Sequence, residues 1–187
     1  SNDGYLLQFV QAQKIPCFGV EPTASTAVAA RAKGIETIEE FFGVELAERL
    51  VGEGKSADLI AANNVLAHVP DINDFVSGFA TLLKNDGVAT FEFPHLMKMV
   101  VDRQFDTIYH EHVAYHSVKP LVAFFKANGM ELIEAIRVGS HGGSLRGIAQ
   151  IAGGPHKVGA SVADAVAYEE KIGLDRAETF RQFGKNI

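Results

Sequence analysis

The sequence predicts an α/β domain in which helices cover a mostly parallel sheet. Along most of the 187 residues, short apolar clusters bounded by turn residues alternate with longer stretches of helical spacing, which is the pattern of such a fold. Near the C-terminal end, two apolar runs are separated only by the glycine-rich segment "GSHGG". Because a connection this short permits a hairpin but not a parallel crossover, we expect an antiparallel C-terminal hairpin.

The individual elements follow from the same pattern in chain order. The apolar clusters predict strands over residues 16–21, 35–37, 58–63, 87–93, 130–138 and 144–151. The stretches of helical spacing predict helices over residues 3–14, 23–33, 39–51, 72–83, 118–128 and 162–173. Gly34 and Gly129 stand where the second and fifth of these helices should stop. Between Pro94 and Val118 the regularity lapses, and this stretch holds four of the seven histidines.

The chain is long enough to bury one sizeable core. We expect residues 1–152 to form this core and residues 153–187 to form a linker and a helix that lead toward a truncated C-terminal domain. The first strand of a doubly wound sheet is central and feeds the turn that holds the ligand. This chain instead opens on the turn "SNDG", so we expect the first strand to lie upstream of Ser1.

Composition and charge exclude several classes of protein. The formal net charge is −6 and no Lys- or Arg-rich run occurs, which opposes nucleic-acid binding because that binding needs clustered cations. The single cysteine, Cys17, excludes an internal disulfide framework, and no apolar run approaches the roughly 20 residues needed to span a bilayer. We expect a cytoplasmic protein that acts on a small molecule, without a membrane or nucleic-acid partner. The oligomeric state has no signal in the sequence.

Candidate ligand-binding residues follow the expected strands, where open α/β sheets bind their ligands. Gly4 lets the backbone approach a ligand closely, and Glu21 can accept both hydroxyls of a ribose. The G-x-G-x-x-G pattern of dinucleotide sites fails in every register that uses Gly4, whereas S-adenosylmethionine has a ribose but no diphosphate. The alternative is that Asp3 is only a helix cap and Glu21 only a surface residue. The segment "ANNVLAHV", at the end of another expected strand, adds two amides and a histidine to these candidates, namely Asn63, Asn64 and His68.

The segment "DTIYHEHVAYH", residues 106–116, has an unusual share of imidazole. Imidazole has an unperturbed pKa of about 6.5, which suits proton abstraction near neutral pH. Transfer of a methyl group to carbon requires a carbanion equivalent, and a base can form one beside a carbonyl group. One alternative is a metal site built from His110, His112 and His116, which we do not favour. The other is a polar loop in which His95, His110 and His116 are structural.

The blocks "SNDGYLL", "GVEP", "ADLIAANNVLAHVPDINDFV", "FDTIYHEHVAYHS" and "HGGSLR", in this order, resemble the S-adenosylmethionine-dependent sugar C-methyltransferases. Those enzymes methylate a carbon beside a ketone in nucleotide-linked deoxysugars. The resemblance implies a Rossmann-like class I methyltransferase fold, S-adenosylmethionine as cofactor and a nucleotide sugar as substrate. Family members also carry a zinc-binding N-terminal domain, so zinc is expected only in such a domain, which this chain does not include.

Carried over by position, the resemblance implies roles for particular residues. The implied cofactor-binding residues are Ser1, Asn2, Asp3, Gly4, Glu21, Asn63 and Asn64. The implied catalytic residues are His112, Tyr109, Glu111 and His68. The resemblance marks His112 as the general base, and from the chemistry of imidazole we expect Glu111 or a neighbouring backbone group to fix its tautomer. The Tyr109 hydroxyl or an N–H of His68 is the donor to the enolate oxygen.

Three further interpretations stay open. Arg146, in "HGGSLR", can meet a phosphate of the nucleotide sugar, although the glycines beside it also suit a plain hairpin turn. A nicotinamide-dependent oxidoreductase is disfavoured by the missing glycine pattern, although Tyr115 and Lys119 have a Tyr-x-x-x-Lys spacing. A non-catalytic cofactor-binding domain is disfavoured by the intact Tyr-His-Glu-His run.

Overall fold

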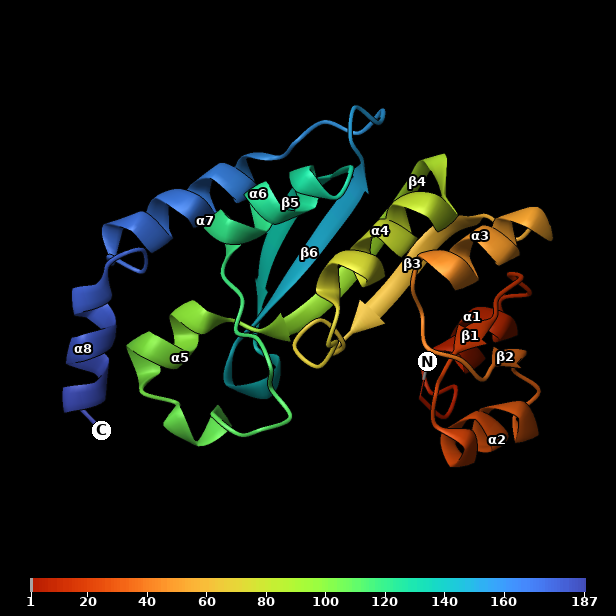
Figure 1. Cartoon of the computed structure of the whole chain (residues 1–187), viewed down its shortest axis with the longest axis horizontal. Coiled ribbons are helices and arrows are strands. Elements are labelled where there is room, and N and C mark those ends of the chain that lie inside the picture. The colour runs from red at the N-terminus through yellow and green to blue at the C-terminus, as the bar shows by residue number, and fades with distance from the viewer. Residues whose placement is uncertain (1) are drawn as a thin grey trace.

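The computed structural model describes residues 2–187 and has the expected α/β arrangement (Figure 1). Its strands are β1 (Gly19–Val20), β2 (Thr37–Ile38), β3 (Ala57–Asn63), β4 (Leu83–Pro94), β5 (Met130–Val138) and β6 (Ser144–Ile151). Its α-helices are α1 (Leu7–Ala12), α2 (Ala24–Ala32), α3 (Val44–Gly52), α4 (Ile72–Leu82), α5 (Leu96–Asp102), α6 (Val118–Ala127), α7 (Ala160–Lys171) and α8 (Ala177–Lys185). Its 3-10 helices are η1 (Phe105–Thr107) and η2 (Ser140–Gly142). Within these residues, no helix combines the length and the apolar composition that crossing a membrane requires.

The larger sheet has the strand order β3-β4-β6-β5. β3 and β4 run parallel, whereas β6 is antiparallel to both β4 and β5. Three of these strands therefore share one direction and β6 runs against them, which confirms a mostly parallel sheet with a C-terminal antiparallel hairpin. β1 and β2 form a separate parallel pair. The arrowheads of β3 and β4 point to the lower side of the molecule in Figure 1.

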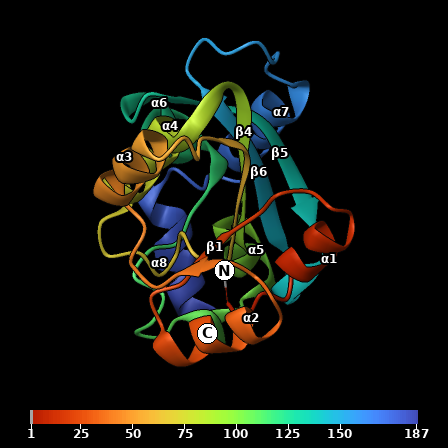
Figure 2. The ribbon, with the colours of Figure 1, turned by 90° about the vertical axis from the view of Figure 1, so that its right-hand side faces the viewer.

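Helices α4 and α6 bury the main core against one face of the larger sheet, and α7 packs beside α6 and β5. Figure 2 shows α3, α4 and α6 on the same side of the strands. At the centre, Phe91 of β4 stacks on Phe93 and on Phe125 of α6, with ring centroids 5.9 and 4.9 Å apart. Gly147 of β6 lies under this ring, because a Cβ there would be 2.2 Å from Phe91 Cζ. This packing fixes the end of β4, next to which the candidate site begins.

Several expected boundaries are wrong for local reasons. The helix expected over residues 3–14 is shortened to α1, because Gly4 and Lys14, near its two expected ends, have left-handed φ angles of 78° and 59°. The helix expected over residues 39–51 begins only at Val44, whose N–H donates to the Asp74 carboxylate of α4 at 3.1 Å. The strand expected over residues 16–21 pairs with β2 only along β1. The sequence pattern also missed α5 and α8, and α8 buries none of its residues.

Candidate active site

The histidine-rich segment lies against the connection between β3 and α4. The backbone N–H groups of Val113 and Ala114 both donate to the carbonyl of Ala67, at 2.9 and 3.3 Å. The ring of His68 donates from Nδ1 to the carbonyl of Glu111 at 2.8 Å. Two segments far apart in the sequence are thus joined mainly through their backbones, and His68 is fixed where they meet.

His116 has a structural role in the same junction. Its ring is buried, donates from Nε2 to the carbonyl of Leu66 at 3.3 Å and meets Phe93 edge to face, with centroids 5.1 Å apart. Burial lowers the pKa of His116, although its hydrogen bond to Leu66 opposes this shift. His110, in contrast, is exposed. Within residues 2–187, no three His, Cys, Asp or Glu side chains are grouped so as to hold a metal ion.

Both ring nitrogens of His112 have partners. Nδ1 lies 3.0 Å from the carbonyl oxygen of Thr107, and Nε2 lies 3.0 Å from the hydroxyl of Tyr109. Because a carbonyl oxygen only accepts, the neutral ring carries its proton on Nδ1 and Nε2 accepts from the Tyr109 O–H. The hydroxyl of Tyr115 also donates to the Thr107 carbonyl, at 3.2 Å. The basic nitrogen of His112 is therefore Nε2, and it accepts a hydrogen bond from the Tyr109 hydroxyl.

His68 lies beside His112, with ring centroids 4.9 Å apart. The Glu111 carbonyl accepts from Nδ1 of His68, so the neutral ring has its lone pair on Nε2. The carboxylate of Glu111 belongs to an exposed residue. Of the two groups expected to fix the His112 tautomer, the structure favours the neighbouring backbone group, which is the Thr107 carbonyl. Tyr109, His112 and His68 thus form one cluster.

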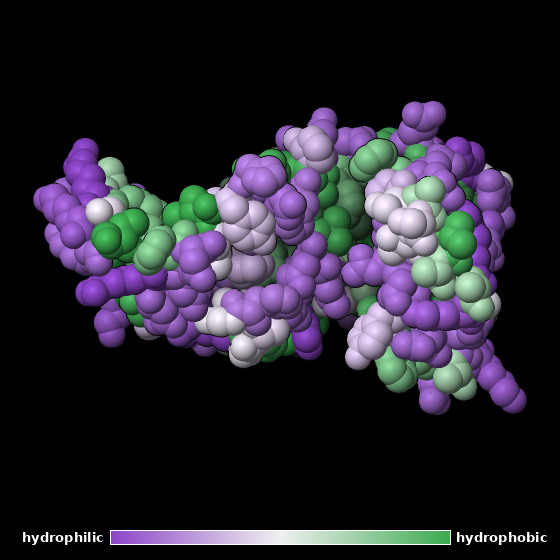
Figure 3. Space-filling model, turned by 90° about the horizontal axis from the view of Figure 1, so that it is seen from below, coloured by the Kyte–Doolittle hydropathy of each residue, from purple (hydrophilic) through white to green (hydrophobic). Residues whose placement is uncertain are grey.

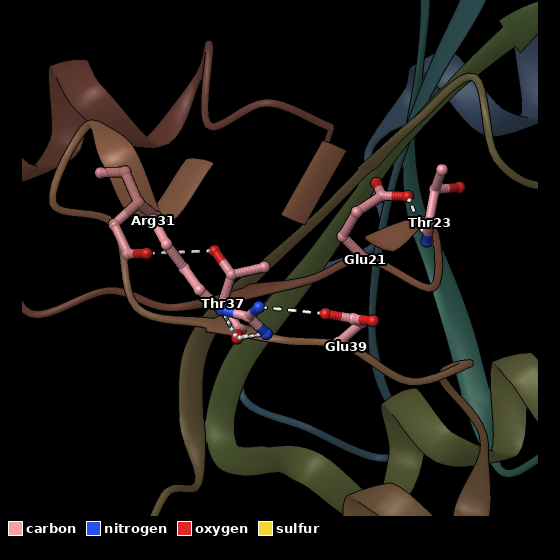
Figure 4. A network of polar contacts seen from close by, with 6 residues as sticks. Glu21, Thr23, Arg31, Thr37 and Glu39 are labelled. Atoms are coloured by element: carbon pink, nitrogen blue, oxygen red, sulfur yellow. Dashed lines mark hydrogen bonds and ion pairs between the residues drawn. The ribbon is translucent and has the colours of Figure 1, made fainter. Parts of the chain in front are cut away.

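The carboxylate of Glu21 is held at the end of β1. It is 7% exposed and accepts the backbone N–H of Asn2 at 2.8 Å and that of Thr23 at 3.0 Å. Burial would raise the pKa of Glu21, whereas the backbone hydrogen bonds from Thr23 and Asn2 are among the interactions that lower it, and the net shift is downward. Figure 4 shows Glu21 turned toward the Thr23 N–H. The ionised carboxylate is therefore preorganised as an acceptor.

The turn expected to hold the cofactor is built around Gly4. A side chain at Gly4 would be strained at φ 78° and would place a Cβ 3.0 Å from Ile35 Cγ1, so glycine is required there. Asp3 forms an ion pair with Lys33, which lowers the pKa of the Asp3 carboxyl. Asp3 does not cap α1, which begins at Leu7 without a side-chain cap. Ser1 lies outside the described residues.

Asn64 presents an unmet acceptor at the end of β3. Its backbone has a left-handed φ of 53° and its N–H donates to the Glu92 carbonyl at 2.7 Å. The buried Oδ1 of Asn64 has no hydrogen-bond partner in the part of the chain that the structure describes. Leaving such an atom unpaired costs about 1–3 kcal/mol, so a ligand N–H or O–H is favoured there. Asn63, the last residue of β3, is exposed.

Arg146 is paired within the sheet. Its Nε and Nη2 contact one carboxylate oxygen of Glu92 at 3.1 and 2.8 Å, and Ser140 donates to the other oxygen. Burial would raise the pKa of Glu92, but the hydrogen bonds from Ser140 and Arg146 lower it. The Glu92 charge balances that of Arg146, whose side chain is 47% exposed. A phosphate contact by Arg146 stays a prediction.

The structure brings together only part of the expected site. Viewed from below, the surface is hollowed between the N-terminal part of the chain, at the right, and the remainder, and apolar atoms line the hollow (Figure 3). The sequence pattern missed Thr107 and Tyr115 as partners in the cluster, and it missed Glu92. A carboxylate within the apolar run "ATFEFP" was a usable signal for Glu92, whereas a backbone carbonyl such as that of Thr107 has no residue-type signal.

Comparison with known proteins gives the same fold and a family. A family model described as a methyltransferase domain matches residues 1–135, and one described as a C-methyltransferase C-terminal domain matches residues 139–187. A curated relative, the C-methyltransferase NovU of Streptomyces niveus, is 33% identical over 183 residues. That match covers 98% of this chain but only 44% of the relative, so the chain spans less than half of the relative's length.

Solved methyltransferases share the fold at low sequence identity. Magnesium protoporphyrin IX methyltransferase from Synechocystis, solved with bound SAH, has a TM-score of 0.59 and 15% identity, over 81% of this chain and 71% of that one. An S-adenosylmethionine-dependent methyltransferase from Anabaena variabilis has a TM-score of 0.62 and 12% identity, over 80% and 74%. The class I methyltransferase fold expected from the resemblance is thereby confirmed. From the match over residues 1–135, the chain belongs to the methyltransferase domain family.

Proposed function

We propose that this chain is the catalytic part of an S-adenosylmethionine-dependent C-methyltransferase that acts beside a ketone of a nucleotide-linked deoxysugar. The observation that carries the proposal is the cluster of Tyr109, His112 and His68. In it, the basic Nε2 of His112 is hydrogen-bonded to the phenol hydroxyl of Tyr109. The relative named as a C-methyltransferase supports this reaction class. A nicotinamide-dependent reaction has no such support.

The cofactor would be held by residues at the ends of β1 and β3. The Glu21 carboxylate, already oriented by two backbone N–H groups, can accept the two hydroxyls of a ribose. The unpaired Oδ1 of Asn64 can accept from an amino group, and the left-handed backbone of Gly4 shapes the turn beside Glu21. Asn2, Asp3 and Asn63 are assigned to the same site because they border these groups in the chain. S-adenosylmethionine supplies an electrophilic methyl group on a sulfonium.

His112 is the general base in this proposal. Nε2 takes the proton from the carbon beside the ketone, while the Thr107 carbonyl keeps the Nδ1 proton in place. The Tyr109 hydroxyl, bonded to Nε2 in the absence of substrate, then turns to the developing enolate oxygen. Donors of this kind contribute about 2.7–4 kcal/mol of transition-state stabilisation.

His68 and Glu111 have supporting roles. In the neutral form, the N–H of His68 is used by the Glu111 carbonyl, so we assign the enolate contact to Tyr109 rather than to His68. The exposed carboxylate of Glu111 is free to meet a hydroxyl of the sugar. Arg146 is a weaker candidate for the phosphate than the sequence implied, because Glu92 already balances its charge.

The test is a methyl-transfer assay with isotopically labelled S-adenosylmethionine and a nucleotide-linked keto-deoxysugar, read by mass spectrometry and NMR. We expect a new C-methyl group, and His112→Asn should lower kcat by about 10²- to 10⁴-fold. His110→Asn is the matched control, because this exposed neighbour should leave the rate unchanged. Full activity of His112→Asn with cofactor still bound would refute the base assignment. Absence of carbon methylation by the unaltered protein would refute the reaction.

A further inference from the structure

Glu169 of α7 is a buried carboxylate with three hydrogen-bond donors. It is 2% exposed, and its Oε1 accepts from Nε2 of His95 at 2.8 Å and from the backbone N–H of Val118 at 2.7 Å. Its Oε2 accepts from the backbone N–H of Lys119 at 2.9 Å. Burial would raise the pKa of Glu169, but these hydrogen bonds, first that of His95, lower it. Acidic side chains are seldom buried unless they are paired in this way.

These donors lie at the two ends of the segment that carries the proposed catalytic cluster. His95 directly follows β4, and Val118 and Lys119 begin α6. Between them run α5, η1 and the histidine-rich segment. The two ends of this stretch lie next to each other, because His95 pairs with His116 and the N–H of Leu96 donates to the His116 carbonyl at 3.0 Å. Residues 96–117 thus form a 22-residue loop, and Glu169 links the residues on either side of it. We call this junction of His95, His116, Val118 and Lys119 the neck.

Among the described residues, Glu169 is the hydrogen-bond partner that the structure gives the ring of His95. It is 1% exposed, and its Nδ1 is buried without a hydrogen bond in the described residues. The contact with Glu169 is therefore the polar contact that sets its orientation. At the C-terminal end of the loop, His116 donates a hydrogen bond to the carbonyl of Leu66. The next residue, Ala67, accepts the backbone hydrogen bonds of Val113 and Ala114 that lie beside His68.

We propose that Glu169 is a positioning residue for the methyl transfer, because it holds both ends of the segment that presents Tyr109 and His112 to His68. This inference rests on the proposed function. It also joins the two parts of the chain, since Glu169 lies in the region that matches the C-methyltransferase C-terminal domain, and the histidine-rich segment lies in the region that matches the methyltransferase domain. In Figure 1, α7 lies beside α6.

Glu169→Gln is the informative substitution, because it keeps the volume but leaves one oxygen to serve donors that now use two. Glu134→Gln is the matched control. Glu134 of β5 accepts a hydrogen bond from Ser161 at the other end of α7, and in residues 2–187 no hydrogen bond is seen between its side chain and the neck. A second pair separates hydrogen bonding from packing: His95→Gln keeps an N–H donor for Glu169, whereas His95→Leu removes it.

The first measurement is hydrogen exchange of residues 105–117 in the protein without substrate. We expect faster exchange in Glu169→Gln and His95→Leu than in Glu134→Gln and His95→Gln. The second is kinetics, in which Glu169→Gln and His95→Leu should each lose about 10- to 100-fold in kcat, as misplaced catalytic groups do. The dissociation constant for S-adenosylhomocysteine should stay unchanged. Circular dichroism at the assay temperature verifies that each variant is folded.

Two outcomes would overturn the inference. One is exchange of residues 105–117 in Glu169→Gln that matches the Glu134→Gln control. The other is equal behaviour of His95→Gln and His95→Leu, because that would reduce the contact to packing. Since exchange needs no turnover, a protein that failed to methylate any keto-sugar would refute the proposed function and leave the exchange comparison to decide the role of Glu169.

Discussion

Tyr109→Phe and His112→Asn, singly and together, test whether these two residues act as one unit. The Tyr109 hydroxyl and His112 Nε2 are 3.0 Å apart, so each substitution breaks the same contact. Asparagine can still donate to the Thr107 carbonyl in place of Nδ1–H, and Tyr109 is 44% exposed. The free energy of unfolding should therefore change by less than about 1 kcal/mol in each variant, and a loss of rate reports on chemistry.

The magnitude follows from what each residue contributes. Loss of the phenol should cost about 10²- to 10³-fold in kcat if it stabilises the enolate, and loss of the imidazole about 10²- to 10⁴-fold. Independent effects would multiply to about 10⁴-fold or more. If enolate formation needs the base and the donor together, the double variant should instead be within about threefold of the slower single variant, as for other coupled catalytic groups.

The assay is single-turnover methyl transfer from labelled S-adenosylmethionine, which separates chemistry from product release. A parallel reading is loss of deuterium from the carbon beside the ketone, because that step needs the base and not the methyl group. Multiplicative losses in the double variant would refute the idea of a single Tyr–His unit. A Tyr109→Phe variant that exchanges deuterium at the normal rate but methylates slowly would move the role of Tyr109 to a later step.

Three other predictions concern stability and substrate binding. Because burial lowers the pKa of His116, the unfolded chain takes up its proton first and stability should fall as the pH drops below about 6.5; His116→Gln should flatten this dependence in urea titrations. Gly147→Ala, whose Cβ would lie 2.2 Å from Phe91 Cζ, should destabilise by about 1–3 kcal/mol and lower the Tm by roughly 2–12 °C; an unchanged Tm would contradict this packing. Arg146→Gln should lower the free energy of unfolding by about 1–3 kcal/mol, because Glu92 loses its charged partner, with little change in KM for the nucleotide sugar; a large rise in KM would assign Arg146 to the phosphate.

The fold was predictable where local signals agreed. The strands Met130–Val138 and Ser144–Ile151 form with the expected bounds, because a glycine-rich turn separates two apolar runs. The start of α3 was not predictable, because its first N–H is met by Asp74 from another helix. α5 lies within the irregular region after Pro94, and its seven residues are too few for a periodic pattern. The strand expected upstream of Ser1 stays a prediction.

The candidate site was predictable as residue types but not as a bonding pattern. Tyr109 and His112 stand in one short segment, and the resemblance assigned His68 to the same catalytic group. Thr107 contributes only its backbone carbonyl to His112, which every residue type possesses. Glu169 is 74 positions from His95, and only the tertiary fold brings them into contact.

The tautomers of His112 and His68 are set in the same way, and this determines which ring nitrogen of each can act as a base. Main-chain carbonyls, those of Thr107 and Glu111, accept the Nδ1 protons of His112 and His68, so both rings have Nε2 as the basic atom. Such acceptors cannot exchange a proton with the ring, and they move only if the segment moves. Correct protonation therefore depends on the backbone geometry of residues 105–117. In the proposed mechanism, constraints on that geometry, including the contacts of Glu169 at the neck, therefore matter as much as the imidazoles themselves.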